Sequence, residues 1–202
     1  MHIATIGAGN VGATLGRRFT EAGHTVSFGV RDPSGDKAVS AAEAAGASTH
    51  TVAEAIEGAD VVLVAVPAAS VPDVAAVLQG TSADTVIDAT NVVGPTASLP
   101  FSSSATYLAD HLPSASVAKA FNTVGFEVMA DPVFGDRRAV LFIAGDERAR
   151  TVAATLGSEI GFDVVALGGS ESIPLVEAQA ITWIRMMSSG AGRRFAFARI
   201  TR

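Results

Sequence analysis

An α/β fold with a doubly wound parallel sheet is predicted by three features of the sequence. Apolar runs suited to buried strands recur along the chain, and stretches with helical periodicity separate them. The clearest run, residues 60–67, is apolar on both faces, as a central strand of a parallel sheet must be. The first strand, residues 2–6, leads directly into a glycine-rich turn and a helix. Such alternation favours parallel strands joined by helical crossovers.

The same patterns divide the chain into elements. We expect strands at residues 2–6, 25–30, 48–51, 60–67, 85–89, 116–120, 139–144 and 162–167. We expect helices from the glycine turn to residue 22 and at residues 34–45, 52–57, 70–78, 107–112 and 173–187. A further helix is expected to follow Asp146 and to end at Ile160. Residues 1–167 are predicted to form a dinucleotide-binding domain of the Rossmann type. Residues 168–202 are predicted to form a short C-terminal helical extension, which packs on that domain or on a second subunit.

The glycine turn after the first strand predicts a dinucleotide site. Gly7 permits a sharp turn off the strand, Gly9 lets a pyrophosphate approach the backbone, and Gly12 lets the helix pack close to the sheet. The helix then begins with free N–H groups and the positive end of its dipole facing the phosphates. A bland structural turn is the alternative, but the strand before the motif and the helix and strand after it favour the nucleotide. The expected site comprises Gly7, Ala8, Gly9, Asn10, Val11 and Gly12.

The end of the second strand indicates which dinucleotide is bound. NAD sites usually place an acidic residue here to hold the ribose hydroxyls. This chain has Val30 followed by Arg31, whose guanidinium can bind a 2′-phosphate through two parallel hydrogen bonds. Asp32 is the rival candidate as a ribose ligand, although Pro33 after it suggests that Asp32 opens a turn. We therefore expect NADP, with Lys37 as a second cation from the following helix.

Composition excludes several classes of protein. The formal charge of −6 argues against a general nucleic-acid binder, because no long basic face is available to neutralise phosphates. The absence of cysteine removes disulfides and thiolate chemistry. No apolar run reaches the roughly 18 residues of a membrane span, and the first strand begins at once, so neither a span nor a signal peptide is expected. The expected location is the cytoplasm.

Ligands of a doubly wound sheet lie at the carboxyl ends of its strands. Val66 and Pro67 end one strand there, and Pro67 either lines the nicotinamide ribose or simply terminates the strand. Asn91 either binds ribose or carboxamide or forms a local turn. Residues 90–106 have no periodicity and form either a lid over the nicotinamide end or a surface loop. Ala120 is a further candidate for the cofactor, and Phe121 and Asn122 suit the edge of a flat substrate ring.

The chain carries a series of motifs at residues 7–12, 22–24, 29–31, 64–67, 88–91, 119–123, 142–146 and 192–197. In this order they resemble the motifs of the NADPH-dependent reductases of the deazaflavin coenzyme F420, and of the related NADPH domain of membrane metalloreductases. Ala8 and Val30 depart from that pattern, because some members carry hydroxyl residues at these positions. The Lys-Ala-Phe-Asn-Thr form at 119–123 is shared with the metalloreductase branch.

The resemblance implies hydride transfer between NADP(H) and a deazaflavin or flavin ring stacked on the nicotinamide. That chemistry needs alignment and exclusion of water more than a side-chain acid, so no catalytic side chain and no metal site are expected. The four histidines form no recognisable acid–base or metal arrangement. The arginines at 137, 138, 185, 193 and 194 either grip an anionic substrate tail or lie on a solvated face or subunit contact.

Three functions follow in order of preference. The first is an NADPH-dependent oxidoreductase of a deazaflavin. The second is an NADPH:flavin or ferric-flavin reductase, and the third is a non-catalytic NADP-binding sensor. An imine reductase is disfavoured, because those folds add a long helical dimerisation domain and only about 35 residues follow Leu167. The apolar helix at 173–187 favours a homodimer.

Overall fold

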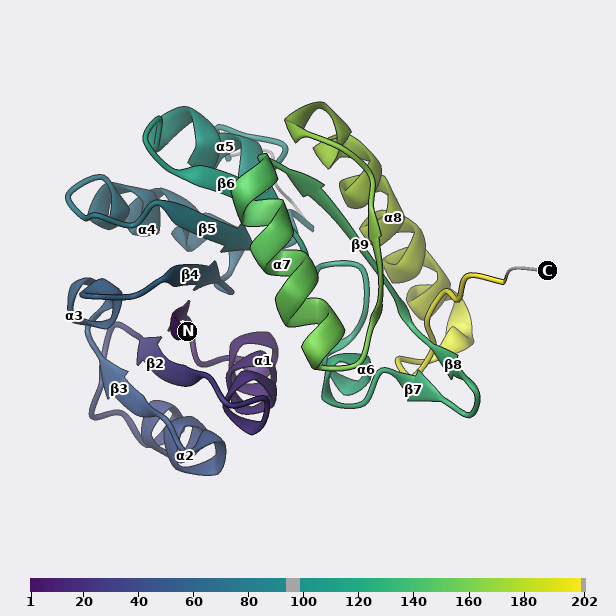
Figure 1. Cartoon of the computed structure of the whole chain (residues 1–202), viewed down its shortest axis with the longest axis horizontal. Helices are drawn as coiled ribbons and strands as arrows, with labels where there is room; N and C mark the ends of the chain where they lie inside the picture. Colours follow the sequence, from purple (N-terminus) through teal and green to yellow (C-terminus); the bar gives the residue numbers. More distant parts are fainter. Residues whose placement is uncertain (94–98, 201–202) are drawn as a thin grey trace.

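The computed structural model describes residues 1–93 and 99–200, and a mostly parallel sheet forms its centre. Its strands are β1 (His2–Ile6), β2 (Thr25–Gly29), β3 (Ser48–His50), β4 (Val61–Val64), β5 (Thr85–Asp88), β6 (Ser116–Lys119), β9 (Val140–Gly145) and β10 (Asp163–Ala166). Within the described residues they form one eight-stranded sheet in the order β10-β9-β6-β5-β4-β1-β2-β3 (Figure 1). Strands β1 to β6 are parallel and follow the 3-2-1-4-5-6 order of dinucleotide-binding sheets. The predicted α/β fold of the Rossmann type is therefore confirmed.

Helices cover both faces of this sheet, and each face has its own apolar core. One face carries α1 (Asn10–Glu21), α2 (Asp36–Ala45), α6 (Phe126–Ala130) and α7 (Glu147–Glu159). The other carries α3 (Val52–Ile56), α4 (Val71–Leu78), α5 (Ser104–His111) and α8 (Ile173–Met186). Short turns lie at Ala68–Ser70, Ser170–Ser172 and Met187–Ala191. Within residues 1–93 and 99–200, no helix combines the length and hydrophobicity needed to cross a membrane.

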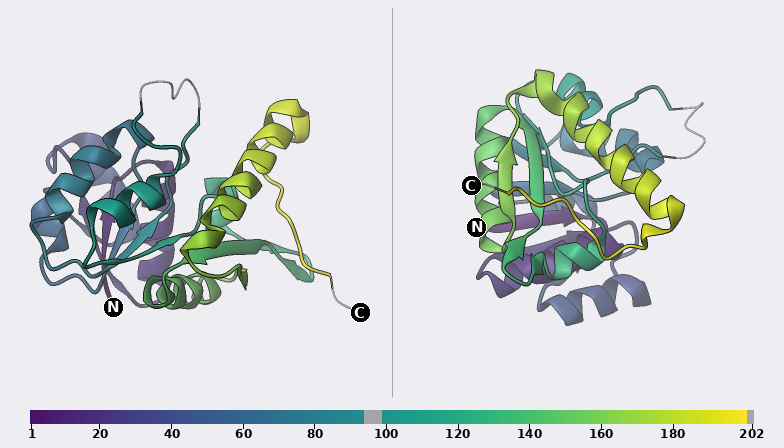
Figure 2. Two further views of the ribbon diagram at one scale, coloured as in Figure 1. Left: turned by 90° about the horizontal axis from the view of Figure 1, so that it is seen from above. Right: turned by 90° about the vertical axis from the view of Figure 1, so that its right-hand side faces the viewer.

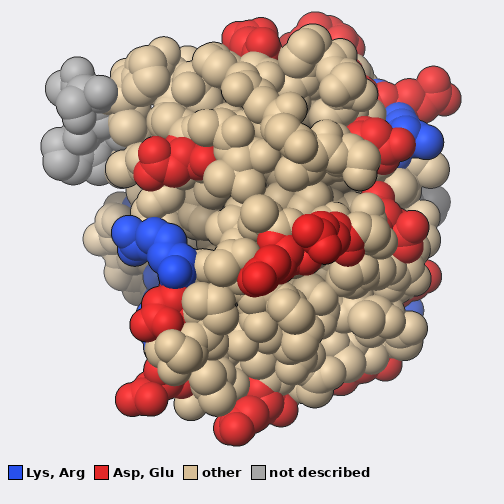
Figure 3. All heavy atoms as spheres, turned by 90° about the vertical axis from the view of Figure 1, so that its left-hand side faces the viewer, with Lys and Arg blue, Asp and Glu red and all other residues tan. Residues whose placement is uncertain are grey.

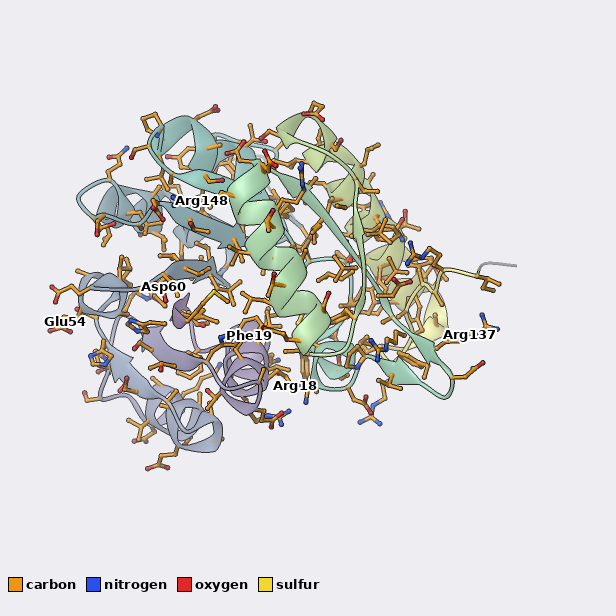
Figure 4. The ribbon with its side chains drawn as sticks, in the orientation of Figure 1. Arg18, Phe19, Glu54, Asp60, Arg137 and Arg148 are labelled. Atoms are coloured by element: carbon orange, nitrogen blue, oxygen red, sulfur yellow. The ribbon has the colours of Figure 1, made fainter. Side chains whose placement is uncertain are left out.

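The buried face of helix α1 combines large residues with glycines, which lets the helix pack closely on the sheet. Leu15 and Phe19 are fully buried on that face. A Cβ at Gly16 would lie 2.5 Å from Cζ of Phe28, so only glycine lets the helix meet β2 at this point. In Figure 4, Phe19 lies inside the molecule where α1 approaches α7. This packing fixes the start of α1 relative to the strand that precedes it.

The sheet is not wholly parallel as predicted, because its last two strands run antiparallel to the other six. Strand β9 pairs with β6 in the antiparallel sense, and β10 is parallel to β9. The connection from β6 contains only the five-residue α6 and a hairpin of β7 (Val133–Phe134) and β8 (Arg137–Arg138). Parallel strands are usually joined by a crossover that contains a full α-helix. This connection has no such helix, and the chain returns along the sheet in the opposite direction. Helix α6 and this hairpin were not predicted either.

The predicted loop at residues 90–106 is only partly a loop. Helix α5 begins at Ser104, after Ser103 accepts a hydrogen bond from the N–H of Thr106 at 3.4 Å. The serines that suggested a loop therefore provide the N-terminal cap of a helix. Residues 94–98, on which the lid interpretation depends, lie outside the described residues.

The chain after α8 folds back across the end of the sheet. Figure 2 shows α8 beside β9, with its C-terminal half projecting from the body of the molecule. Trp183 of α8 stacks on Phe195 with ring centroids 5.2 Å apart, and its indole N–H donates to the carbonyl of Phe195 at 3.0 Å. Arg193 Nε lies 2.6 Å from Glu127 Oε1. These contacts attach the returning segment to both α8 and α6.

Acid is expected to loosen this attachment through Glu127. Burial raises the pKa of the Glu127 carboxyl, but hydrogen bonds from Arg193 and from its own backbone, with the nearby arginine charges, bring the pKa below its usual value. Its stabilising effect is therefore present above the unfolded pKa of about 4.3 and is lost as the pH falls through the lower folded value. Emission of Trp183, the only tryptophan, should differ between wild type and Glu127→Gln at pH 7, and this difference should vanish in acid. A pH-independent difference would contradict the role of the charge.

Candidate functional site

A cleft opens at the carboxyl ends of β1 and β4, where the strand order reverses. Its volume is about 670 Å³. The turn after β1, the end of β2, the start of α2 and the start of α4 contribute its walls. Ligands of doubly wound sheets bind at this topological switch point. The predicted residues that line it are Gly7, Ala8, Gly9, Val30, Arg31, Lys37, Val66 and Pro67.

The three glycines of the turn have three different surroundings. Gly7 has a φ of +103°, and a Cβ there would lie 2.5 Å from the carbonyl oxygen of Ala65. A Cβ at Gly12 would lie 1.9 Å from the carbonyl oxygen of Gly7, so α1 packs directly on the turn. Apart from its chain neighbours, a Cβ at Gly9 would meet no heavy atom of the described residues within 4 Å. Gly7 and Gly12 are therefore needed by the fold, whereas the space beside Gly9 is open to a ligand.

The start of α1 is electrostatically different from the other two helices that begin at the cleft. Asp36 lies in the first turn of α2 and Asp73 in the first turn of α4, where a carboxylate suits the positive end of the helix dipole. Helix α1 has no acidic residue in its first turn and no side-chain cap at Gly9. Its free N–H groups and dipole therefore remain available to an anion, the arrangement that binds phosphate in such folds.

The end of β2 separates the roles of Arg31 and Asp32. Ser34 donates to Asp32 Oδ1 from its N–H at 3.1 Å and from its hydroxyl at 2.7 Å, so Asp32 closes a turn toward α2. Arg31 is exposed, lines the cleft, and has no ion pair or side-chain hydrogen bond within residues 1–93 and 99–200. Lys37 lines the same cleft. Figure 3 shows a small group of basic side chains beside a hollow, on a face where acidic side chains are more numerous and a second basic group lies near the opposite edge.

The remaining predicted residues lie beside the cleft rather than in its wall. Asn10 and Val11 follow Gly9 in the first turn of α1, with Asn10 exposed. Ala120 is fully buried, and its N–H donates to the carbonyl of Asp88 at 3.1 Å. Asn91 and Asn122 meet at the ends of the next two strands, where Asn91 Nδ2 donates to the carbonyl of Asn122 at 2.9 Å.

Phe121 requires a correction, because its ring does not face a ligand. Its φ of +61° is rare for a residue with a side chain and turns the ring away from the strand end. The ring is fully buried and makes edge contacts with Phe19 and Phe162, with centroids 5.9 Å and 6.3 Å away. Phe121 therefore belongs to the core, and a direct contact with a substrate ring is not part of this geometry.

A buried lysine beside the cleft is the feature that sequence reasoning missed. Lys119, the last residue of β6, has a fully buried side chain whose Nζ lies 2.7 Å from Asp88 Oδ2 and 2.9 Å from Glu177 Oε1. It also donates to the carbonyl of Thr90. Ser104 Oγ lies 3.1 Å from the same nitrogen. The only sequence signal was its place in a motif used for family resemblance, since a lysine that ends a strand normally reaches solvent.

Three of the five arginines proposed as possible grips for a substrate tail lie in two separate places. Arg193 is bound to Glu127, and its guanidinium carbon lies 5.2 Å from the centroid of the Phe126 ring. Arg137 and Arg138 line a separate cavity of about 570 Å³ near Arg199, which is paired with Asp163. In Figure 4, Arg137 lies at the end of the molecule opposite Glu54 of α3. None of these three arginines lines the cleft at the glycine turn.

Comparisons with known proteins identify a matching family model and similar solved structures. The family described as "NADP oxidoreductase coenzyme F420-dependent" matches residues 2–92, which run from β1 through β5. A candidate F420-dependent NADP reductase from Arthrobacter sp. FB24 is 26% identical, with a TM-score of 0.82 and 99% of each chain covered. A hypothetical protein from Sinorhizobium meliloti is 29% identical, with a TM-score of 0.75, covering 100% of this chain and 96% of that one.

More distant structures share the fold. The imine reductase from Myxococcus stipitatus in complex with NADP+ is 19% identical with a TM-score of 0.67. The match covers 94% of this chain but 62% of the imine reductase. By sequence over residues 2–92, and by fold over nearly its whole length, this protein is similar to the NADP oxidoreductases of the coenzyme F420-dependent family.

Proposed function

We propose that this protein is an NADPH-dependent oxidoreductase that transfers hydride between NADP(H) and the ring of a deazaflavin coenzyme. The observation that carries the proposal is the cleft at the switch point, where an open glycine, an uncapped helix start and an unpaired arginine meet among the described residues. The similarity to a candidate F420-dependent NADP reductase supports the choice of acceptor. NADPH supplies the hydride when bound, and the accepting ring also takes up one proton.

In this proposal the residues of the cleft bind and orient. The N–H groups at the start of α1 and the open backbone at Gly9 hold the pyrophosphate, and Arg31 with Lys37 holds the 2′-phosphate. Val66 and Pro67 line the cleft beyond the turn, where the nicotinamide ribose would lie. Positioning of two rings and exclusion of water supply the rate enhancement, so no side-chain acid is assigned.

The acceptor is tested by mixing purified protein with NADPH and, separately, with the deazaflavin coenzyme, FMN, FAD or a ferric chelate. Loss of NADPH absorbance with the deazaflavin alone would support the proposal. Oxidation with the flavins or ferric chelate instead would assign the protein as a flavin or ferric-flavin reductase. NADPH binding without oxidation by any acceptor would favour a sensor.

Arg31→Ala is expected to weaken NADPH binding by about tenfold and NADH binding very little. The reason is that a charge-assisted hydrogen bond to phosphate is lost, and only NADPH carries the 2′-phosphate. Titration of both nucleotides by fluorescence measures the difference. Arg137→Ala, an exposed arginine on β8, is the matched control and should change neither affinity. Equal weakening of both nucleotides would reject the 2′-phosphate role.

We also propose a cytoplasmic homodimer in which residues 168–202 form an extension that packs on a second subunit. Leu175, Ile181 and Met186 of α8 are exposed by 59%, 52% and 41%. Several large apolar residues exposed on one helix are typical of an interface. Sedimentation of the purified protein would give its subunit number.

A further inference from the structure

Asn122 holds a hydrogen-bond acceptor that the fold leaves unused. The residue is only 3% exposed, yet its Oδ1 has no hydrogen-bond partner among the described residues. The amide orientation is set by two neighbouring oxygens, because Nδ2 lies 3.3 Å from Asn91 Oδ1 and 3.5 Å from Glu177 Oε2. Exchanging the amide nitrogen and oxygen would place an oxygen against both. A buried acceptor without a partner is costly, so it calls for a donor that the described residues do not supply.

Glu177 places a carboxylate oxygen next to this acceptor. Its Oε1 is held by Lys119 at 2.9 Å and by the hydroxyl of Ser103 at 2.9 Å. Among residues 1–93 and 99–200, its Oε2 has only the long contact to Asn122, and the side chain is 17% exposed. One oxygen of Glu177 is thus fixed by the fold, while the other lies next to the side-chain amide of Asn122.

Lys119 explains why a carboxylate can be kept at this position. Lys119 and Asp88 have fully buried side chains, and Glu177 is the second carboxylate within ion-pair distance of the lysine. Without the lysine, two negative charges would be desolvated side by side, which proteins avoid unless a counter-charge is present. Lys119 therefore acts through Glu177 as a positioning residue, joining α8 to the ends of β5 and β6.

This acceptor pair is joined to the cleft by the end of β5. The hydroxyl of Thr90 donates to the carbonyl of Val66 at 3.2 Å, and Val66 lines the cleft. Asn91, the next residue, contacts Asn122. The pair therefore lies at the same edge of the sheet as the glycine turn, toward β5 and β6, on the side away from Arg31.

We propose that Asn122 Oδ1 and Glu177 Oε2 accept hydrogen bonds from an amide-type N–H at the edge of the bound redox ring. This inference rests on the proposed function and deepens it. Two donors have the required chemistry, namely the carboxamide NH₂ of the nicotinamide and the imide N–H of a flavin-type pyrimidinedione. Each would satisfy the unpaired Asn122 oxygen and bring its ring to the ends of β5 and β6.

The test compares ligands that differ only in that N–H. NADP+ is compared with its 3-acetylpyridine analogue, which lacks the carboxamide NH₂. Lumiflavin is compared with 3-methyllumiflavin, which lacks the imide N–H. Affinities are measured by titration for wild type, Asn122→Leu and Glu177→Gln, with Gln79→Leu and Glu43→Gln as exposed amide and carboxylate controls. Glu177→Gln is a nearly isosteric substitution, so this variant still tests the proposal if Asn122→Leu fails to fold.

Wild type is expected to prefer the N–H form of one pair by about tenfold, and both variants are expected to reduce that preference while the controls keep it. The pair that responds identifies the donor. The double variant Asp88→Asn/Lys119→Met should lose the same preference, a readout that mere loss of stability would not move, because both ligands of a pair would weaken together. Equal affinities within both pairs, or a preference that neither variant changes, would overturn the inference.

The proposed function fails separately from this inference. If NADP+ does not bind wild type, both are wrong. If NADP+ binds in an Arg31-dependent manner and neither pair is discriminated, only the role of Asn122 and Glu177 is wrong.

Discussion

Replacing Lys119 with methionine is expected to lower the free energy of unfolding by about 3–5 kcal/mol, the range seen when one partner of a buried ion pair is removed. Methionine fills a similar volume, so the loss comes from charge rather than from a cavity. It leaves the buried Asp88 carboxylate without its counter-charge and Glu177 without the partner of Oε1. Urea unfolding of wild type and variant measures the change.

The chain contains its own control, because Lys37 is the other lysine in the sequence. Lys37 is exposed on α2, so Lys37→Met should change the unfolding free energy by less than about 0.5 kcal/mol. Adding Asp88→Asn to Lys119→Met should recover part of the lost stability, since it removes the stranded charge. If Lys119→Met is as stable as Lys37→Met, the buried ion cluster does not hold these strand ends together.

The contrast between the glycine turn and the lysine cluster explains how much could be predicted from the sequence. Gly7, Gly9 and Gly12 are close together in the chain, and their spacing alone predicts the turn after β1 and the close packing of α1 on it. Lys119 meets Asp88 and Glu177 only after β5, β6 and α8 have assembled. Neither residue is close to it in sequence, so no local pattern indicates that this lysine is buried.

Phe121 and β9 were misjudged for related reasons. An aromatic residue at a strand end suits a ring-binding surface, but a positive φ, which the sequence does not reveal, directs Phe121 inward. The apolar run of residues 139–144 correctly predicts a buried strand. The same apolar pattern fits a parallel and an antiparallel strand, so it does not predict the strand direction. Direction depends on the connection, and the short α6 with its hairpin lacked a clear pattern.

The second large effect is expected at the glycine turn, where two alanine substitutions should separate binding from folding. Gly9 has a φ of −76°, and an alanine Cβ there meets no protein atom within 4 Å. Gly9→Ala should therefore unfold within about 0.5 kcal/mol of wild type. It should still weaken NADPH binding by at least about tenfold, because the methyl group occupies the space in which the pyrophosphate contacts the backbone.

Gly12→Ala is expected to show the opposite order of effects. Alanine favours a helix over glycine by about 1 kcal/mol, but its Cβ would lie 1.9 Å from the Gly7 carbonyl oxygen. Because both groups belong to the backbone, neither can move aside without shifting α1, so a net loss of about 3 kcal/mol is expected. Unfolding and NADPH titration of both variants, with the exposed Gly80→Ala as control, check this. Unchanged NADPH affinity in Gly9→Ala would mean that the phosphates do not lie at this turn.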